Sequence, residues 1–468
     1  MKYHYLSILL LFFTLSSMGY VQADPSRLSG GGNFTNGATD ATVQQQFNAL
    51  AEAGAGAVRL NLYPGEYFAN SKPLPSHLDA QVLLAHQHGV QTIILLFEYY
   101  GSYQKPDGPP HQLGGYAKWH DIGAAFAERF APNSAWLKSK GINNWGITIF
   151  QAFNEPDAEK SIPLTGEESY YNALRGLADG VHSVDRQLAV IPGGFMSENA
   201  ASDHNLRGYG TAIAPLLNDG TLSGLDLHTY NDIFYAPILN REGRVTFDFS
   251  PQSDFDSVKA ACHITRDIAF YSTEYNFKAN EQGIDEALAA RRLLTCIWAN
   301  LGVVGADNKT SATKLALIWN LFNTTQADRT YGLNWRLDPW VPTARGRTFR
   351  LVMAISKGME FTRLDPKGRG DFVLEGNRRK LWVWQNYDQW SNMHGTSYTV
   401  EDIPLGARKL EVFGWDGLRR SIDLAGQQRL LVEGLPQNET LMFLAGSGAS
   451  GIVYWTESVS KRSLSVET

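Results

Sequence analysis

Cysteine is scarce in this sequence: its 468 residues include only two, Cys262 and Cys296. Two cysteines cannot form a disulfide framework, and the spacing of cysteine and histidine is not that of a zinc site. Cys296 lies in an apolar helical pattern. The sequence therefore leaves two possibilities open, a single disulfide formed in an oxidising compartment or two buried free thiols.

The sequence also lacks a marked excess of charge of either sign. The formal net charge is −6 at pH 7, and lysine and arginine are dispersed along the chain. Nucleic-acid binding through bulk positive charge is therefore not indicated, and no nucleic-acid partner is expected.

Long apolar runs are absent beyond the first 23 residues, so no membrane span is expected. Within residues 1–23, Lys2 precedes the apolar run LSILLLFFTL, and small residues lie near Ala23. This pattern is typical of a secretory signal peptide, and its apolar run is too short to span a bilayer comfortably. We therefore expect a soluble, exported protein, located outside the cell or in a periplasm.

From residue 28 to residue 358, predicted strands alternate with predicted helices. A capping box at Thr165 and Glu168 indicates the start of one helix, and a short helix is expected near residues 211–217. Eight alternations over this length are typical of an α/β fold, the single-domain (β/α)₈ or TIM barrel. The predicted strands cover residues 28–35, 57–63, 90–97, 145–156, 187–195, 222–230, 268–276 and 315–321.

After residue 358 the pattern changes to short apolar runs separated by turn residues, which is typical of a small all-β sandwich. The runs cover residues 372–374, 380–385, 397–400, 409–413, 428–432 and 439–443. The sequence thus predicts a signal peptide at 1–23, a catalytic barrel at 24–358, a β-sandwich domain at 359–447 and a C-terminal tail at 448–468.

Two glutamates lie at the ends of predicted buried strands. Glu155 precedes Pro156, which cannot donate to a strand ladder, and Glu274 follows the apolar run that begins at Ile268. The carboxyl ends of barrel strands share one face, so both side chains should face one cleft. Glycoside hydrolysis uses such a pair: a carboxylic acid protonates the leaving oxygen, and a carboxylate attacks the anomeric carbon or activates water.

The motifs Asn154-Glu155-Pro156 and Thr273-Glu274-Tyr275 resemble the signatures of clan A retaining glycoside hydrolases. The resemblance is greatest to family 39, with families 5 and 30 as relatives. It covers the predicted barrel and, more loosely, the β region that follows. The resemblance implies that Glu155 is the acid/base, that Glu274 is the nucleophile, and that Asn154 binds the sugar 2-hydroxyl.

The same resemblance implies roles for four further residues. Arg59 would keep the nucleophile ionised, His228 and Tyr230 would contact the nucleophile and the substrate, and Trp319 would form the aromatic floor of a sugar subsite. It implies no metal and no organic cofactor, and a carbohydrate as the binding partner. The oligomeric state stays open.

The expected function is that of a secreted retaining glycoside hydrolase that cleaves β-glycosidic bonds in a polysaccharide or oligosaccharide by double displacement. Two alternatives remain: a transglycosidase that uses the same glutamates, and a non-catalytic glycan-binding protein on the same fold. Each site residue also has a structural alternative. Glu155 could cap a helix, Glu274 and Arg59 could be structural ion-pair partners, and Trp319 could serve only in packing.

Overall fold

The structure is a computed structural model of the chain. It describes residues 29–31, 40–62, 74, 76–98, 114–157, 163–196, 204–230, 238–239, 245–246, 251–277, 279, 284–320, 331–337, 340–365, 370–376, 378–387 and 395–446. The predicted signal peptide and C-terminal tail lie outside the described residues.

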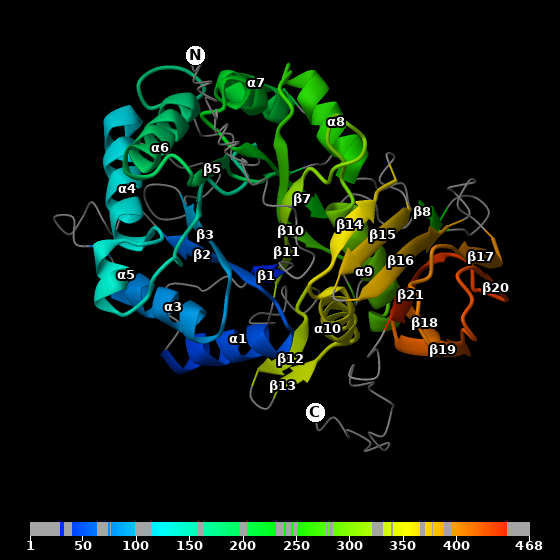
Figure 1. Cartoon of the computed structure of the whole chain (residues 1–468). Coiled ribbons are helices and arrows are strands. Elements are labelled where there is room, and N and C mark those ends of the chain that lie inside the picture. Colours follow the sequence, from blue (N-terminus) through cyan, green and yellow to red (C-terminus); the bar gives the residue numbers. More distant parts are fainter. Residues whose placement is uncertain are drawn as a thin grey trace, which may run out of the picture.

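The first half of the chain forms one arc of parallel strands that follow chain order. The arc comprises β2 (Ala57–Leu62), β3 (Thr92–Phe97), β4 (Ile149–Ala152) and β5 (Ala189–Pro192). The helices of this half are α1 (Asp40–Glu52), α3 (Ser76–Gln87), α4 (Gly115–Phe130), α5 (Ala135–Ser139) and α6 (Tyr170–Val184). They lie outside the strands, as Figure 1 shows.

A second parallel arc continues the series. It comprises β6 (Phe195–Met196), β7 (Gly224–Tyr230), β10 (Ala269–Asn276), β11 (Thr313–Trp319) and β1 (Ser29–Gly31). Its helices are α7 (His204–Asp219), α8 (Pro251–Ala261), α9 (Glu286–Leu301) and α10 (Ala344–Ser356). Two antiparallel pairs form separate small sheets, β8 (Ile238–Leu239) with β9 (Val245–Thr246), and β12 (Asn334–Leu337) with β13 (Trp340–Pro342).

The two arcs approach each other at both ends. Only Gly193 and Gly194 separate β5 from β6, so these strands are two parts of the predicted fifth strand, and β1 lies beside β2. This strand order is compatible with an eight-stranded α/β barrel. The alternation of strands and helices predicted from the sequence is confirmed.

Several predicted boundaries were wrong. The capping box is not formed, because Gly166 has a φ of +90° and interrupts any helix through residues 165–168. Helix α6 instead begins at Tyr170, and the side chain of Ser169 caps it by accepting a hydrogen bond from the backbone N–H of Asn172. Helix α7 is longer than the predicted 211–217, and β4 is shorter than the predicted 145–156. Of the predicted strand 28–35, only residues 29–31 lie within the described residues, and they form β1.

The C-terminal region consists of two antiparallel sheets. The larger has the order β14 (Glu360–Arg363), β15 (Asp371–Gly376), β16 (Arg379–Asn386), β21 (Glu439–Gly446), β18 (Lys409–Gly414) and β19 (Gly417–Asp423). The smaller pairs β17 (Ser397–Val400) with β20 (Leu430–Glu433). Tyr398 of β17 stacks between Trp384 and Phe443 of the larger sheet, with centroids 5.1 and 4.9 Å away, so the two sheets share an apolar layer.

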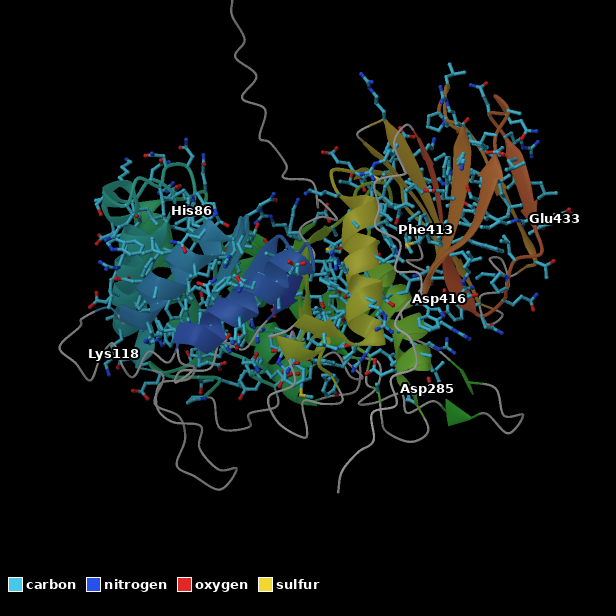
Figure 2. The ribbon with its side chains drawn as sticks, turned by 90° about the horizontal axis from the view of Figure 1, so that it is seen from below. His86, Lys118, Asp285, Phe413, Asp416 and Glu433 are labelled. Atoms are coloured by element: carbon cyan, nitrogen blue, oxygen red, sulfur yellow. The ribbon has the colours of Figure 1, made fainter. Side chains whose placement is uncertain are left out.

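The larger sheet also packs against α9. Thr295 on this helix lies 2.6 Å from the hydroxyl of Tyr387 and 2.9 Å from that of Thr440. The main apolar core continues across this contact to Leu381 and Met442. Figure 2 shows the region that carries Phe413, Asp416 and Glu433 on the side of the molecule opposite the helices with His86 and Lys118.

The structure decides between the two possibilities for the cysteines. Cys262 and Cys296 are both buried, and they do not form a disulfide, so the second of the two possibilities holds. Within the described ranges, no helix combines the length and the apolar character needed to cross a membrane.

Helices α4 and α6 pack with their backbones unusually close. A Cβ atom added at Gly176 would lie 2.3 Å from the carbonyl oxygen of Tyr116, and one at Gly180 would lie 2.1 Å from that of His120. Each glycine costs helix stability of roughly 0.5–1 kcal/mol relative to alanine. This cost is offset by the close contact that only glycine permits.

We predict that Gly180→Ala destabilises the protein, although a change from glycine to alanine stabilises a helix whose surface is exposed. The added methyl must push the two helices apart, so the free energy of unfolding should fall by roughly 1–3 kcal/mol. Chemical denaturation measures this change. The control is Arg175→Ala on the exposed face of α6, which should stay within about 0.5 kcal/mol of the wild type. A Gly180→Ala protein as stable as the wild type would contradict the close packing.

Candidate active site

A buried ion pair joins the two arcs of strands. Arg59 on β2 contacts Oε1 of Glu274 on β10, and their side chains are only 3% and 9% exposed. Arg59 also donates to Oδ1 of Asn154 at 3.1 Å and to Oγ1 of Thr273 at 2.9 Å. The guanidinium therefore connects the carboxyl ends of β2, β4 and β10 at one place.

Both carboxylate oxygens of Glu274 have partners. Arg59 contacts Oε1, and the hydroxyl of Tyr230 donates to Oε2 at 2.7 Å. Burial acts to raise the pKa of Glu274, but the charges of His228 and Arg59 outweigh it and hold that pKa below its usual value. Glu274 is therefore an ionised, oriented carboxylate at neutral pH.

Glu155 lies next to Glu274. Oxygens of the two carboxylates are within 4.8 Å of each other and of the ring of His228. Glu155 follows β4 with a φ of 43°, in the left-handed region, and its side chain is 26% exposed. One carboxylate of the pair is thus buried and held by donors, whereas the other is open to solvent.

His228 on β7 lies between the two glutamates. Its Nδ1 is 2.8 Å from Oε1 of Glu155 and 3.6 Å from Oε2 of Glu274. Burial acts to lower the pKa of His228, but Glu274 and Glu155 raise it to about 9. The ring position depends on Gly194, because a Cβ atom there would lie 2.0 Å from the imidazole.

An aromatic group borders Glu274. The ring of Tyr230 lies edge-on to Trp319 at 6.2 Å and to Tyr331 at 5.6 Å, and the latter two are 4.9 Å apart. Asn276 donates to the backbone carbonyl oxygens of Trp319 and Tyr331 and so fixes both segments. The structure thus brings all the predicted site residues together. Tyr331 was missed, because it lies in a stretch with no strand or helix pattern.

Two further carboxyl groups lie near the pair. Glu98, at the end of β3, accepts a hydrogen bond from Asn61 at 3.4 Å, and burial raises its pKa to about 7 against the effect of Arg59. Asp157 accepts from the backbone N–H of Met196 at 3.1 and 3.2 Å, and burial raises its pKa to about 7 as well. Neither residue is among the site residues predicted from the sequence.

The ligand atoms of Glu155, His228 and Glu274 are also close enough together to hold a cation. Arg59 and the protonated ring of His228 already place positive charge beside these atoms, which opposes cation binding. The expectation that no metal is required stays a prediction.

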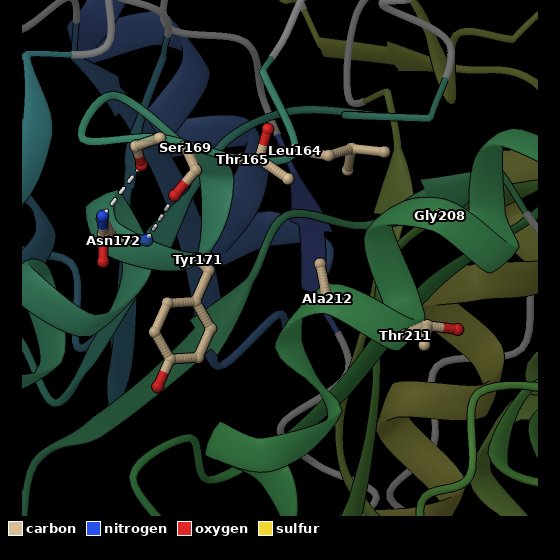
Figure 3. Close-up of a pocket in the computed structure, with 9 residues that line it drawn as sticks. Leu164, Thr165, Ser169, Tyr171, Asn172, Gly208, Thr211 and Ala212 are labelled. Carbon is tan, nitrogen blue, oxygen red and sulfur yellow. Dashed lines mark hydrogen bonds between the residues drawn. The ribbon is translucent and has the colours of Figure 1, made fainter.

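A separate surface hollow of about 700 Å³ lies between the start of α6 and the early turns of α7 (Figure 3). Leu164, Tyr171, Asn172, Thr211 and Ala212 are among the residues that line it. The side chain and backbone of Asn172 already hydrogen-bond to the loop that precedes α6. None of the predicted site residues lines this hollow, so it is distinct from the glutamate pair.

No protein-family model and no curated sequence matches this chain. Solved structures do match. They include a family 39 glycoside hydrolase from the gut symbiont Bacteroides cellulosilyticus, with a TM-score of 0.55, 16% identity, and 91% of this chain and 82% of the other covered. A family 30 endoxylanase from Clostridium papyrosolvens has a TM-score of 0.58 at 12% identity, with 91% and 97% covered.

A glucosidase from Croceicoccus marinus also matches, with a TM-score of 0.57, 14% identity, and 90% of this chain and 96% of the other covered. At these identities the likeness shows the fold. The chain therefore has the fold of clan A glycoside hydrolases, among them families 39 and 30. The resemblance predicted from the two glutamate motifs is confirmed at this level.

The raised pKa of Glu98 predicts a specific dependence of stability on pH. Its folded-state pKa of about 7 lies above the ordinary value of 4.5, so between these values the folded protein binds a proton that the unfolded chain has lost. Stability contributed by this group therefore falls as pH rises through the window. Glu98→Gln keeps an acceptor for Asn61 and removes the titration.

We expect the stability difference between Glu98→Gln and the wild type to shift in favour of the variant from pH 4.5 to pH 7.5, as measured by chemical denaturation. Glu52→Gln, at the exposed end of α1, is the control and should show no such trend. A constant difference between Glu98→Gln and the wild type across this range would contradict the raised pKa.

Proposed function

We propose that this protein is a retaining glycoside hydrolase. The observation that carries the proposal is the separation of Glu155 and Glu274, whose carboxylate oxygens approach within 4.8 Å. Direct attack on the anomeric carbon requires carboxyl groups about 5–5.5 Å apart, whereas an inverting enzyme needs about 6.5–9.5 Å to admit a water molecule. The short separation favours the retaining reaction.

In the first step, Glu274 attacks the anomeric carbon while Glu155 gives its proton to the departing glycosidic oxygen. The bond from the anomeric carbon to that oxygen breaks, and an ester to Glu274 forms. In the second step, Glu155 removes a proton from water, and this water displaces Glu274 from the anomeric carbon. Two inversions restore the original configuration.

The surroundings of each carboxylate suit these roles. Arg59 and Tyr230 orient Glu274 and favour its ionised form. The greater exposure of Glu155 lets it meet both the leaving group and water. Arg59 holds Asn154 by donating to its Oδ1, and Asn154 is the residue proposed to bind the sugar 2-hydroxyl. The rings of Trp319 and Tyr331 provide apolar surface for a sugar ring.

The substrate proposed is a β-linked polysaccharide or oligosaccharide. The matching structures include an endoxylanase and a glucosidase, which supports glycans as the substrate class. We also propose that the two arcs close into one (β/α)₈ barrel within residues 24–358 and that the later sheets form a β-sandwich domain at 359–447. We further propose that residues 1–23 are a signal peptide that directs export of the protein.

The test begins with a panel of dinitrophenyl β-glycosides and polysaccharides, which identifies the sugar that is cleaved. The 2-deoxy-2-fluoro glycoside of that sugar should then label Glu274, because the fluorine slows hydrolysis of the ester. Mass spectrometry of peptides locates the label. Glu274→Gln should take no label, and Glu52→Gln should behave as the wild type.

Glu155→Gln tests the acid role of Glu155 independently of the nucleophile. On poor leaving groups it should lose about 10²–10⁴-fold in rate, the usual contribution of general acid catalysis, and much less on dinitrophenyl glycosides. Equal losses on both would contradict the acid role. Transfer of the sugar to added acceptors in place of water would favour the transglycosidase alternative. Glycan binding with neither turnover nor label would favour the non-catalytic one.

A further inference from the structure

Three buried polar residues lie beneath the glutamate pair and take no part in the mechanism above. They are Gln151 on β4, Asp226 on β7 and Thr273 on β10, and each is fully buried. Buried polar groups must find hydrogen-bond partners, so the arrangement of their hydrogens is restricted.

Asp226 is surrounded by donors. Its Oδ1 accepts from the backbone N–H of Thr273 at 2.8 Å, and its Oδ2 accepts from the hydroxyl of Thr273 at 2.6 Å. Gln151 also donates to Oδ2. Burial acts to raise the pKa of Asp226, and His228 and the two bonds from Thr273 only partly offset it. The donors nevertheless match the ionised carboxylate, which accepts and does not donate.

The hydroxyl of Thr273 therefore has its hydrogen committed to Asp226. A hydroxyl has one hydrogen, so its oxygen can only accept from its other neighbours. One neighbour is Nη1 of Arg59 at 2.9 Å, which is always a donor. A second donor is Nε2 of Gln151 at 3.2 Å, which also donates to Asp226. The remaining neighbour is Nε2 of His228 at 3.1 Å. The only donor that the structure places near this Nε2 is Nη1 of Arg59, at the longer distance of 3.5 Å. Because the closer oxygen of Thr273 can only accept, the arrangement favours a hydrogen on Nε2.

We propose that Asp226 and Thr273 are positioning residues that keep a hydrogen on Nε2 of His228 and thereby direct its Nδ1 to Glu155. This inference rests on the proposed function and deepens it. The charged groups closest to His228 are Arg59 from β2, Glu155 after β4, Asp226 from β7 and Glu274 from β10. The carboxyl groups of Glu98 and Asp157 also interact with its charge.

The consequence concerns Glu155 during the reaction. When Glu155 gives its proton to the departing oxygen, it becomes a carboxylate 2.8 Å from Nδ1 of His228. With Nε2 already protonated, the imidazolium donates Nδ1–H to this carboxylate and stabilises it. The Nδ1 proton stays on His228 throughout, and the proton that moves is the one on Glu155. His228 thus stabilises the carboxylate form of Glu155, both when Glu155 has given up its proton and while Glu155 acts as the base.

The test is Asp226→Asn, which keeps the shape and replaces one oxygen by a donor. With Oδ1 still on the backbone N–H of Thr273, the amide NH₂ faces the hydroxyl, whose hydrogen then turns to Nε2 of His228. NMR of the imidazole nitrogens in histidine-labelled protein follows the titration, and His228→Gln identifies the resonances. The pKa of His228 should fall by about one unit or more in Asp226→Asn and in Thr273→Val.

Thr273→Ser keeps the hydroxyl and should retain the wild-type titration, and the exposed-site control Asp179→Asn should do the same. If Asp226→Asn fails to fold, the pKa of His228 in Thr273→Val and in Thr273→Ser still tests the inference, because only Thr273→Val should lower it. On a glycan with a poor leaving group, Asp226→Asn should lose about tenfold or more in kcat, and much less on the dinitrophenyl glycoside.

An unchanged pKa of His228 in both Asp226→Asn and Thr273→Val would overturn the inference. The NMR titration needs no substrate, so it separates the two proposals. A shifted titration in a protein that cleaves no glycan would support the assigned hydrogens while contradicting the proposed function. Cleavage with an unshifted titration would contradict this inference alone.

Discussion

The ion pair between Arg59 and Glu274 is the contact on which the rest of the site depends. A carboxylate with a 9% exposed side chain is strongly disfavoured unless it is paired and hydrogen-bonded. Arg59 and Tyr230 supply those partners, and the same guanidinium holds Asn154 and Thr273. Removing one partner of such a buried pair typically costs about 3–5 kcal/mol, because the other charge is left unpaired. The pair therefore fixes three strand ends at one point.

This fixed point gives two chemically identical side chains different properties. Glu274 is buried among donors that favour its ionised form, whereas Glu155 is more exposed and faces His228. Environment of this kind is how proteins assign nucleophile and acid roles to two carboxylates. The backbone contributes as well, because Gly194 leaves the space that the ring of His228 fills. The geometry of the site therefore depends on the packing around it as well as on the residues that would react.

Much of this arrangement was predictable because each predicted site residue on a strand lies at or near the end of an apolar run. Parallel strands in a barrel bring such ends to one face, so Arg59, Glu274 and Tyr230 could be placed together without coordinates. What escaped prediction has no local signal. Strand β19 is mostly exposed and has no apolar run, and Tyr331 reaches the site from a segment without periodicity. The Asp226–Thr273 bond joins residues far apart in the sequence, so only the folded chain shows it.

The most direct test of the central claim is the anomeric configuration of the first sugar released, observed by proton NMR immediately after enzyme is added to a β-glycoside. The short separation of Glu155 and Glu274 predicts that the β-anomer appears first and that the α-anomer grows in later by mutarotation. Release of the α-anomer first would show that water attacks directly, and it would contradict a covalent intermediate on Glu274.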